Sequence, residues 1–470
     1  MSPDSSTAVE PLDIAIIGGG AAGVLVAIHL LEASQGKIRL TLIEPRAMIG
    51  QGAAYSTQYP EHLLNVVAGR MSAFDAEPMH FTRYLDALVP EHPVVEEALP
   101  TARRFAQRRE FGRYLQATLA ARIDPTALHC QDEAIDIAGT GPYAIALRSG
   151  RRISARAVVL ALGNFPRSLP VPTAAIHGSP RIENAWDYAA VRRLDPDADL
   201  CIVGSGLSMV DAVISLAEVG HRGKITVLSR HGLMPLAHAT AGSQDGHIDE
   251  LLALNVRERM RTLRDHAATR SLAGEPWQWT MDRLRHHGQA LWQSLDEAEQ
   301  RRFLRHAVRI WDIHRHRIAP QIAARIEGMQ RTGQLQSRAG HVLSIGGDKA
   351  AAGVRFRARG KVGDIGEIQA QCVLNCTGVE TRLPRMHSPL LQALASRGMI
   401  RPGPHEIGYG CDDAGALLSV EGSVQSDLLT LGAARIGQCW ESIAIPELRR
   451  QAEDISRHLL ARLRTPCRHG

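Results

Sequence analysis

The sequence predicts an α/β fold built from two similar units, one inserted into the other, together with a helical insertion. A buried-strand pattern, a glycine-rich turn and a helix pattern follow one another within residues 13–31, and the same succession returns within 199–219. Apolar runs that end in glycine, at 157–163 and 372–378, lie on either side of the second unit. A chain of 470 residues is too long for one core, so two or three domains are expected.

The first glycine-rich turn has the spacing of a dinucleotide-binding motif. Its strand, residues 13–17, runs directly into Gly18, Gly20 and Gly23, and a helix pattern follows. The first glycine permits the tight turn, the second lets the backbone approach a pyrophosphate, and the third lets helix pack on strand. The N-terminus of the helix presents unpaired N–H groups and the positive end of its dipole to the phosphates. This unit is therefore predicted to be a Rossmann-like nucleotide-binding domain.

An acidic residue follows the next strand of this unit. The strand pattern of residues 39–43 is followed directly by Glu44, at about the distance from the glycines where a ribose-binding carboxylate is expected. Such a carboxylate accepts hydrogen bonds from the ribose hydroxyls and repels a 2′-phosphate. The first unit is therefore expected to hold the ADP half of FAD or NAD rather than NADP.

The second unit repeats the glycine pattern with one change. A strand at 199–203 leads into Gly204 and Gly206, and a helix pattern follows. Met209 replaces the third glycine, so strand and helix are expected to lie slightly farther apart. A second Rossmann-like nucleotide site is predicted here.

The two nucleotide sites differ at the end of the next strand. In the second unit this strand ends in Ser229 and Arg230, where the first unit has its acid. A hydroxyl and a guanidinium suit a 2′-phosphate, because arginine donates two parallel hydrogen bonds to phosphate oxygens. We expect NADPH to be preferred over NADH. The alternative, that Arg230 only stacks on the adenine, would leave both coenzymes usable.

The apolar runs that flank the second unit match the return strands of this architecture. They end in Gly163 and Gly378, where the chain crosses between domains beside a nucleotide. The NAD(P)H unit is therefore inserted in the FAD unit, which closes near Gly432 and with a helix starting at Pro446. By architecture, the N-terminus of that helix faces the flavin pyrimidine ring. The predicted domains are a first FAD-binding part at 1–170, an NAD(P)H-binding domain at 195–370 with a helical insertion at about 235–330, and a second FAD-binding part at 371–470.

Composition narrows the classes of partner. Apolar residues make up 44% of the chain and charged residues 22%, as in a folded soluble protein. The net charge of +5 is spread out, which argues against nucleic acid and leaves room for a small anionic ligand. Seven scattered cysteines fit a reducing cytoplasm. The polar, acidic start is unlike a signal peptide, and glycines interrupt the first apolar stretch, so neither secretion nor a membrane is expected.

Some chemistries are not expected from this sequence. A disulfide reductase would need a close cysteine pair on the helix that follows the first glycine turn, and none stands there. His314 and His316 would point to different faces of a helix, and the cysteines lack zinc-site spacing, so no metal site is expected.

Longer strings point to a family. With both glycine motifs in place, the chain resembles, along nearly its full length, a group of bacterial FAD/NAD(P)-binding proteins that includes FAD-dependent urate hydroxylases and, more distantly, aspartate N-monooxygenases. The strings that carry the resemblance are residues 52–56, 62–66, 70–72, 220–223, 229–233, 311–317, 440–442 and 446–448.

The resemblance implies a flavin monooxygenase that uses FAD, NAD(P)H and O2. NAD(P)H would reduce FAD, the reduced flavin would form a C4a-(hydro)peroxide with O2, and one oxygen atom would pass to the substrate. The specific expectation is hydroxylation of urate, an anion at neutral pH, to 5-hydroxyisourate. One alternative is N-hydroxylation of an amino acid such as aspartate. Another, from a different class, is a redox-sensing or electron-donating flavoprotein that acts on a protein partner.

Two segments supply candidates for contacts with flavin and substrate. In residues 62–72, Asn65, Arg70 and Ser72 are expected to hydrogen-bond flavin or substrate, unless they only order a loop. Near the end of the helical insertion, His314 is expected to move a proton, and Arg315 or Arg317 to hold an anionic substrate. The alternative is that these basic residues only satisfy the carbonyls and dipole at a helix C-terminus.

Arg230 allows a direct test of the coenzyme preference. Replacing Arg230 with Ala should raise the KM for NADPH and spare that for NADH, because only NADPH carries the 2′-phosphate. A phosphate contact of this kind contributes about 1.5–3 kcal/mol. Steady-state kinetics with both coenzymes measure the effect, and an equal loss with both would contradict the assignment.

Overall fold

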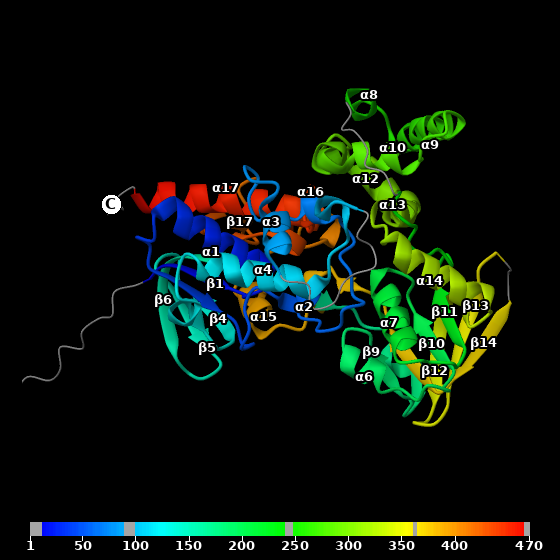
Figure 1. Cartoon of the computed structure of the whole chain (residues 1–470). Coiled ribbons are helices and arrows are strands. Elements are labelled where there is room, and N and C mark those ends of the chain that lie inside the picture. The colour runs from blue at the N-terminus through cyan, green and yellow to red at the C-terminus, as the bar shows by residue number, and fades with distance from the viewer. Residues whose placement is uncertain (1–11, 89–98, 240–247, 361–363, 465–470) are drawn as a thin grey trace, which may run out of the picture.

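The computed structural model describes residues 12–88, 99–239, 248–360 and 364–464, which form two sheets flanked by helices (Figure 1). One half of the molecule joins the first strand of the chain to its last helix. The other half is built from the middle of the chain. This α/β architecture, with two sheets that are largely parallel, confirms the predicted fold class.

The first sheet is parallel over five neighbouring strands. Its order is β17 (Ala416–Leu418), β18 (Val424–Thr430), β6 (Arg152–Leu160), β1 (Leu12–Ile17), β2 (Leu40–Ile43) and β3 (His129–Cys130), with the antiparallel strands β4 (Ala134–Ala138) and β5 (Tyr143–Leu147) attached to β6. Ile16 of β1 pairs with Leu42 on one side and Val159 on the other, and all three are fully buried. Such uninterrupted apolar strands are typical of a parallel sheet covered on both faces.

Helices from both ends of the chain cover this sheet. One face packs against α1 (Ala21–Ser34), α4 (Arg108–Ala120) and α17 (Ile445–Arg464), and the other against the β4–β5 pair and α15 (Pro389–Ser396). Figure 1 shows α17 running along α1. Shorter helices in this half are α2 (Gly52–Tyr55), α3 (His80–Ala87), α5 (Pro125–Leu128) and α16 (Ile436–Cys439).

The second sheet repeats the parallel arrangement. Its order is β14 (Ile365–Ala370), β13 (Ala352–Ala358), β12 (Leu335–Gly347), β11 (Ile225–Ser229), β10 (Leu200–Val203), β15 (Cys372–Asn375) and β9 (Ile182–Asn184), with β8 (Ile176–Gly178) beside β12. The strands from β12 to β9 are parallel, and β13 and β14 are antiparallel additions. Helices α7 (Leu207–Glu218) and α14 (Pro320–Arg331) pack on one face, and α6 (Tyr188–Arg192) lies beside α7.

The strand pairing corrects two expected boundaries. Strand β15 pairs in parallel with β10, so residues 372–375 complete the second sheet. The expected return at 371 to the half with the first sheet, which we call the FAD half after its predicted cofactor, therefore lies too early. Strands β8 and β9 also belong to this sheet, so its contributions begin before 195. The chain crosses between the halves at β7 (Phe165–Pro166) and β16 (Val379–Glu380), which pair with each other.

A group of helices stands apart from both sheets, above the second one in Figure 1. Its members are α8 (Asp249–Leu252), α9 (Val256–Leu272), α10 (Gln278–Arg283), α11 (Gly288–Gln293), α12 (Glu297–Arg302), a π-helical turn (Phe303–Ala307) and α13 (Val308–Arg315). The group has its own apolar core. Because α14 packs on α7, the separate helical body ends before Pro320 rather than at about 330. None of the described helices is long and apolar enough to cross a membrane.

Aromatic contacts join this helical body to the FAD half. Trp292 Nε1 donates a hydrogen bond to the carbonyl oxygen of Gly437 at 3.0 Å. The rings of Trp292 and Trp440 stack with their centroids 5.0 Å apart. Trp440 has φ +58°, a left-handed value that is unfavourable for a bulky side chain. The packing of Trp440 therefore holds the backbone in a strained conformation at the edge of the helical body.

Polar contacts hold the two sheet-containing halves together. Arg108 on α4 makes a bidentate ion pair with Asp211 on α7, with N–O distances of 2.6 and 3.0 Å. Close by, His62 Nε2 and Ser215 Oγ share a hydrogen bond of 2.7 Å. Burial is the largest influence on the pKa of His62 and lowers it, so the ring stays neutral at pH 7. The segment around His62 is thereby fixed to α7.

Removing the charge of Asp211 should loosen this junction. Asp211→Asn leaves the Arg108 guanidinium buried without its counterion, and we expect a loss of up to about 3–5 kcal/mol in the free energy of unfolding. Asp197→Asn is the matched control, because the Arg222–Asp197 pair is solvent-exposed and should contribute little to stability. Denaturant unfolding measures both variants, and equal losses would contradict a role for the buried pair.

Candidate functional site

The first glycine turn is closed by contacts that leave no space for side chains. Gly18 has φ +107°, and a Cβ placed on it would lie 2.2 Å from the carbonyl oxygen of Ala161 at the end of β6. A Cβ on Gly23 would lie 2.0 Å from the carbonyl oxygen of Gly18. Gly20 faces the backbone of Gly52, at 3.4 Å from a built Cβ. The turn therefore brings bare backbone to the N-terminus of α1, where a pyrophosphate would be held.

Glu44 reaches this turn from the end of β2. Its Oε2 accepts a hydrogen bond from the N–H of Gly19 at 2.8 Å, and its Oε1 accepts one from the N–H of Arg46 at 3.1 Å. The carboxylate is only half-buried. It is thus oriented beside the glycines, as the ribose-binding prediction requires, and that contact stays a prediction.

The second glycine turn reproduces the first. Gly204 has φ +106°, and a Cβ placed on it would lie 2.2 Å from the carbonyl oxygen of Cys376, just past the end of β15. Gly206 faces open space, with no atom within 4 Å of a built Cβ. Met209, at the third position, is completely buried and packs in the core of this half. The Met209 side chain thus fills space beside the strand that a glycine at this position would leave open.

The hydroxyl and guanidinium at the end of β11 lie next to this turn. Ser229 Oγ is 2.9 Å from Ser205 Oγ and accepts a hydrogen bond from the N–H of Gly232 at 3.1 Å. Arg230 is exposed. A residue that the sequence did not indicate also reaches the turn: Arg309 of α13 donates from Nη2 to the carbonyl oxygens of Ser205 and Leu233, both at 2.9 Å.

Further cations surround the second turn. Burial lowers the pKa of Arg309, and the charge of Arg230 lowers it further, while Asp312 opposes the shift. Burial also lowers the pKa of Arg167, and the charges of Arg230, Arg382 and Arg385 lower it further. Burial raises the pKa of Asp312 to about 6. This concentration of positive charge suits a phosphorylated nucleotide.

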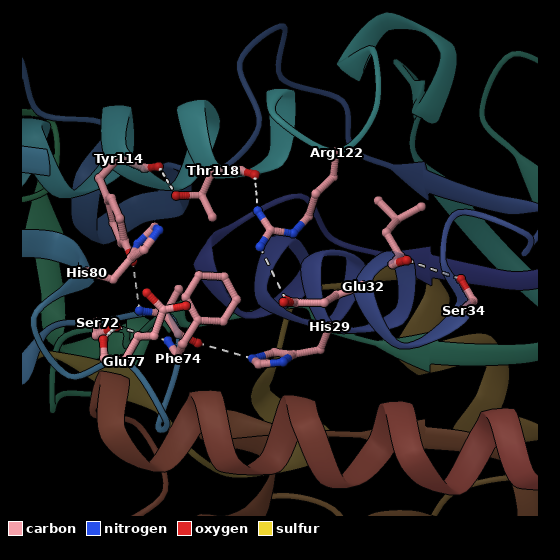
Figure 2. A network of polar contacts seen from close by, with 12 residues as sticks. His29, Glu32, Ser34, Ser72, Phe74, Glu77, His80, Tyr114, Thr118 and Arg122 are labelled. Carbon is pink, nitrogen blue, oxygen red and sulfur yellow. Dashed lines mark hydrogen bonds and ion pairs between the residues drawn. The ribbon is translucent and has the colours of Figure 1, made fainter.

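Ser72 lies inside the loop that follows the first turn, as Figure 2 shows. It is fully buried, its hydroxyl donates to the carbonyl oxygen of Glu77 at 2.7 Å, and it accepts a hydrogen bond from the N–H of Phe74. The N–H of Ala73 donates to the hydroxyl of Tyr114 on α4. These contacts order the loop, and the contact of Ser72 with FAD stays a prediction.

The other predicted residues of this segment differ in their surroundings. Asn65 is half-buried, and its backbone carbonyl oxygen lies 3.0 Å from His238 Nε2. Arg70 is half-buried, and its guanidinium has no hydrogen bond or ion pair to any residue that the structure describes. Its charge nevertheless acts on Arg285 and Arg317 of the helical body.

The two candidates on α13 lie in different environments. His314 is partly exposed, shares a 2.8 Å hydrogen bond with the carbonyl oxygen of Ile310 in its own helix, and contacts the edge of Trp277. Arg315 is 5% exposed, and its Nη2 lies 3.0 Å from Glu441 Oε2 in an ion pair. These two neighbouring residues therefore have different surroundings, and only Arg315 belongs to a buried set of polar side chains.

Arg315 belongs to a set of guanidiniums that we name the arginine cluster: Arg70, Arg285, Arg315 and Arg317. Arg317 pairs with Asp282 and donates to the carbonyl oxygen of Gln278 at 3.0 Å, and Arg285 lies 3.7 Å from the same carboxylate. Burial is the largest cause that lowers the pKa of Arg285, to about 9, and the charge of Arg315 is the next. The guanidinium remains protonated at pH 7.

Acidic and neutral groups border the arginine cluster. Burial alone would raise the pKa of Glu441, but Arg315, His316 and a 3.0 Å hydrogen bond from Trp311 Nε1 together lower it. Burial lowers the pKa of His316 to about 4, so this ring is neutral at pH 7. Glu447, in the first turn of α17, has its pKa raised by burial.

The three remaining predicted glycines all adopt left-handed backbone conformations. Gly163 and Gly378 follow β6 and β15, with φ +70° and +86° and open space at a built Cβ. Gly432 follows β18 with φ +71°. Its N–H donates to Gln451 Oε1 at 2.9 Å, and its carbonyl oxygen accepts from Ser442 Oγ at 2.8 Å. These bonds fix the end of β18 to the start of α17. Their predicted contacts with cofactors stay predictions.

Within the described ranges, no group of three or more His, Cys, Asp or Glu side chains is placed to hold a metal ion. The six cysteines in those ranges are free thiols, and five of them are buried.

The space beside Gly206 allows a test of the second site that leaves the fold intact. Gly206→Ala should raise the KM for NADPH by roughly tenfold or more, about 1.4 kcal/mol, because its methyl group occupies the path of the pyrophosphate. The thermal midpoint and FAD content should not change, since φ is −90° and nothing lies within 4 Å. Gly204→Ala is the contrasting variant and should destabilise the protein. Unchanged NADPH kinetics in Gly206→Ala would contradict the site.

Comparison with known proteins agrees with this geometry. Residues 15–165 match the family described as FAD-NAD(P)-binding. This match confirms the expected cofactor class, FAD together with a nicotinamide dinucleotide. No curated protein matches the sequence.

Solved structures of similar architecture cover almost the whole chain. Ornithine hydroxylase from Pseudomonas aeruginosa, in its reduced form, is 17% identical with a TM-score of 0.65, covering 97% of this chain and 100% of its own. The ornithine N-hydroxylase of Kutzneria sp. 744, solved with reduced FAD, NADP+ and L-ornithine, is 14% identical (TM-score 0.63, 97% and 100%). L-lysine 6-monooxygenase from Pseudomonas syringae is 15% identical (TM-score 0.62, 96% and 99%). The chain therefore has an FAD/NAD(P)-binding domain within the fold of these flavin monooxygenases.

Proposed function

We propose that this chain is an FAD-dependent monooxygenase that uses NADPH and O2 to hydroxylate the amine nitrogen of a small amino acid. The observation that carries the proposal is the path of α13. Arg309, near the start of α13, contacts the second glycine turn. Arg315 lies six residues later, about 9 Å along the helix axis, in the arginine cluster. The predicted NADPH-binding turn and a buried basic region are thus joined by fewer than two turns of one helix.

The FAD half reaches the same region from the other side. Glu441 pairs with Arg315, and the neighbouring Ser442 is bonded to Gly432 at the end of β18. Arg70 comes from the loop after the first glycine turn. A substrate in the arginine cluster would therefore lie between the elements that hold the two cofactors, where a flavin monooxygenase needs it.

FAD, when bound, would take a hydride from NADPH and activate O2 for transfer of one oxygen atom to the substrate. The residues of this chain would bind the substrate and keep water away, because Arg285, Arg315 and Arg317 are each at least 95% buried. Their positive charges disfavour the protonated form of a nearby amine. The cluster would thereby favour the neutral amine, which has the lone pair that accepts oxygen.

Hydroxylation of urate, the leading expectation from the sequence, is the second candidate. The same excess of positive charge would attract the urate anion. The amine reading is preferred because the structures that share this fold over nearly the whole chain include two ornithine hydroxylases and a lysine monooxygenase. An electron-donating flavoprotein that acts on a protein partner is the rival from another class.

The function is tested by following NADPH oxidation and O2 consumption by the purified flavoprotein with aspartate, ornithine, lysine or urate. An amino acid should accelerate NADPH oxidation at least tenfold, and a hydroxylamine or a further N-oxidised product should accumulate. The Gly206→Ala variant should lose this stimulation at low NADPH and regain it at high NADPH.

Two outcomes would contradict the proposal. Stimulation by urate, with urate consumed in proportion to NADPH, would establish the second candidate instead. Slow NADPH oxidation that neither amino acids nor urate accelerate would favour the flavoprotein with a protein partner.

A further inference from the structure

The arginine cluster contains more hydrogen-bond donors than its surroundings use. Buried N–H groups without a partner in the described part of the chain are Arg285 Nε and Nη1, Arg315 Nε and Nη2, and Arg317 Nε. Arg315 Nη2 is close to Glu441 in an ion pair, but it is not aligned for a hydrogen bond. A buried donor that bonds to neither water nor protein is unfavourable. Five such donors in one cluster point to an acceptor that the protein itself does not supply.

The charges of the cluster are also unbalanced. Four guanidiniums face two fully engaged carboxylates, because Asp282 pairs with Arg317 and Glu441 pairs with Arg315 while accepting from Trp311. Glu447 has a partner outside the cluster, because its Oε1 lies 3.6 Å from Arg450 Nη2. His238 adds no charge, because burial lowers its pKa to about 4. Two positive charges are therefore left without a counterion in a buried region, which is costly unless an anion binds there.

The two surplus charges are distributed over two groups. Arg285, in the turn after α10, and Arg317, in the segment after α13, share Asp282. Arg315 forms the second group, in a separate ion pair with Glu441, while the charge of Arg70 acts on Arg285 and Arg317. Each group can present a planar guanidinium fork, and one fork matches one carboxylate.

We propose that the arginine cluster binds a small dicarboxylate, one carboxylate at Arg285 and Arg317 and the other at Arg315. The two carboxylates are inferred from the cluster alone, and the amine rests on the proposed function. Together they make the substrate an amino acid with an acidic side chain. A urate monoanion would leave one charge unbalanced. Ornithine or lysine would bring a second ammonium group into a region already rich in positive charge.

Succinate tests the binding site without the reaction, because it has two carboxylates and no amine to hydroxylate. The FAD-loaded, full-length protein is heated with increasing succinate, acetate, inorganic phosphate, urate or ornithine. Succinate should raise the thermal midpoint in a saturable manner. The other four ligands should require concentrations about tenfold higher or more for the same shift.

Arg285→Met separates a binding role from a structural one. Met removes one of four mutually repelling charges, so the protein without succinate should be as stable as the wild type or more stable. The stabilisation by succinate should nevertheless fall at least tenfold in apparent affinity. The matched control is Arg301→Met, in the same helical body, whose exposed side chain pairs with Glu297. It should retain the full succinate response.

Several results would overturn the dicarboxylate site. These are no response to succinate, an equal response to phosphate or to acetate, and an Arg285→Met protein that is destabilised yet still responds to succinate. The outcome also separates this site from the proposed function. Succinate binding without oxidation of any amine would refute only the N-hydroxylation, and oxidation of ornithine without succinate binding would refute only the dicarboxylate site.

Discussion

In both halves of this protein, a glycine lies against the carbonyl group that follows a neighbouring parallel strand, and the rest of the structure depends on that contact. Gly18 meets Ala161 and Gly204 meets Cys376, with nearly the same left-handed φ. Any side chain at either glycine would overlap the carbonyl oxygen. The contact fixes where each following helix begins, and therefore where a dinucleotide pyrophosphate can be held.

The second level of organisation comes from segments that lie outside the two sheets. The π-helical turn Phe303–Ala307 leads into α13, which contacts the second glycine turn and ends in the arginine cluster. From the FAD half, the strained residue Trp440 packs into the helical body and directs Glu441 toward Arg315. π-helical turns and positive φ values at bulky residues are both concentrated at functional sites in proteins. Here the two features meet, because the rings of Phe303 and Trp440 lie edge to face with their centroids 5.2 Å apart.

Local patterns in the sequence were sufficient to predict the two glycine turns, the alternation of strands and helices and the cofactor class. Each of these depends on residues close together in the chain. The extent of the second sheet was less predictable. The apolar pattern of residues 372–375 indicates a buried strand but not which of the two sheets it joins, and in the structure it pairs with β10. The arginine cluster was only partly predicted. Arg70, Arg315 and Arg317 were candidates. Arg285 and Glu441 were not, because their interactions with Arg315 span 30 and 126 residues of sequence, which periodicity does not reveal.

In the proposed arrangement, a dicarboxylate in the arginine cluster lies next to the flavin, between the elements predicted to hold the two cofactors. The most direct measurement is the visible absorbance of the bound FAD during titration with succinate. We expect a saturable change in the flavin spectrum with the same midpoint as the thermal stabilisation, and we expect this change to be lost in Arg285→Met. A protein that is stabilised by succinate while its flavin spectrum stays unchanged would contradict the placement of the substrate site beside the cofactor.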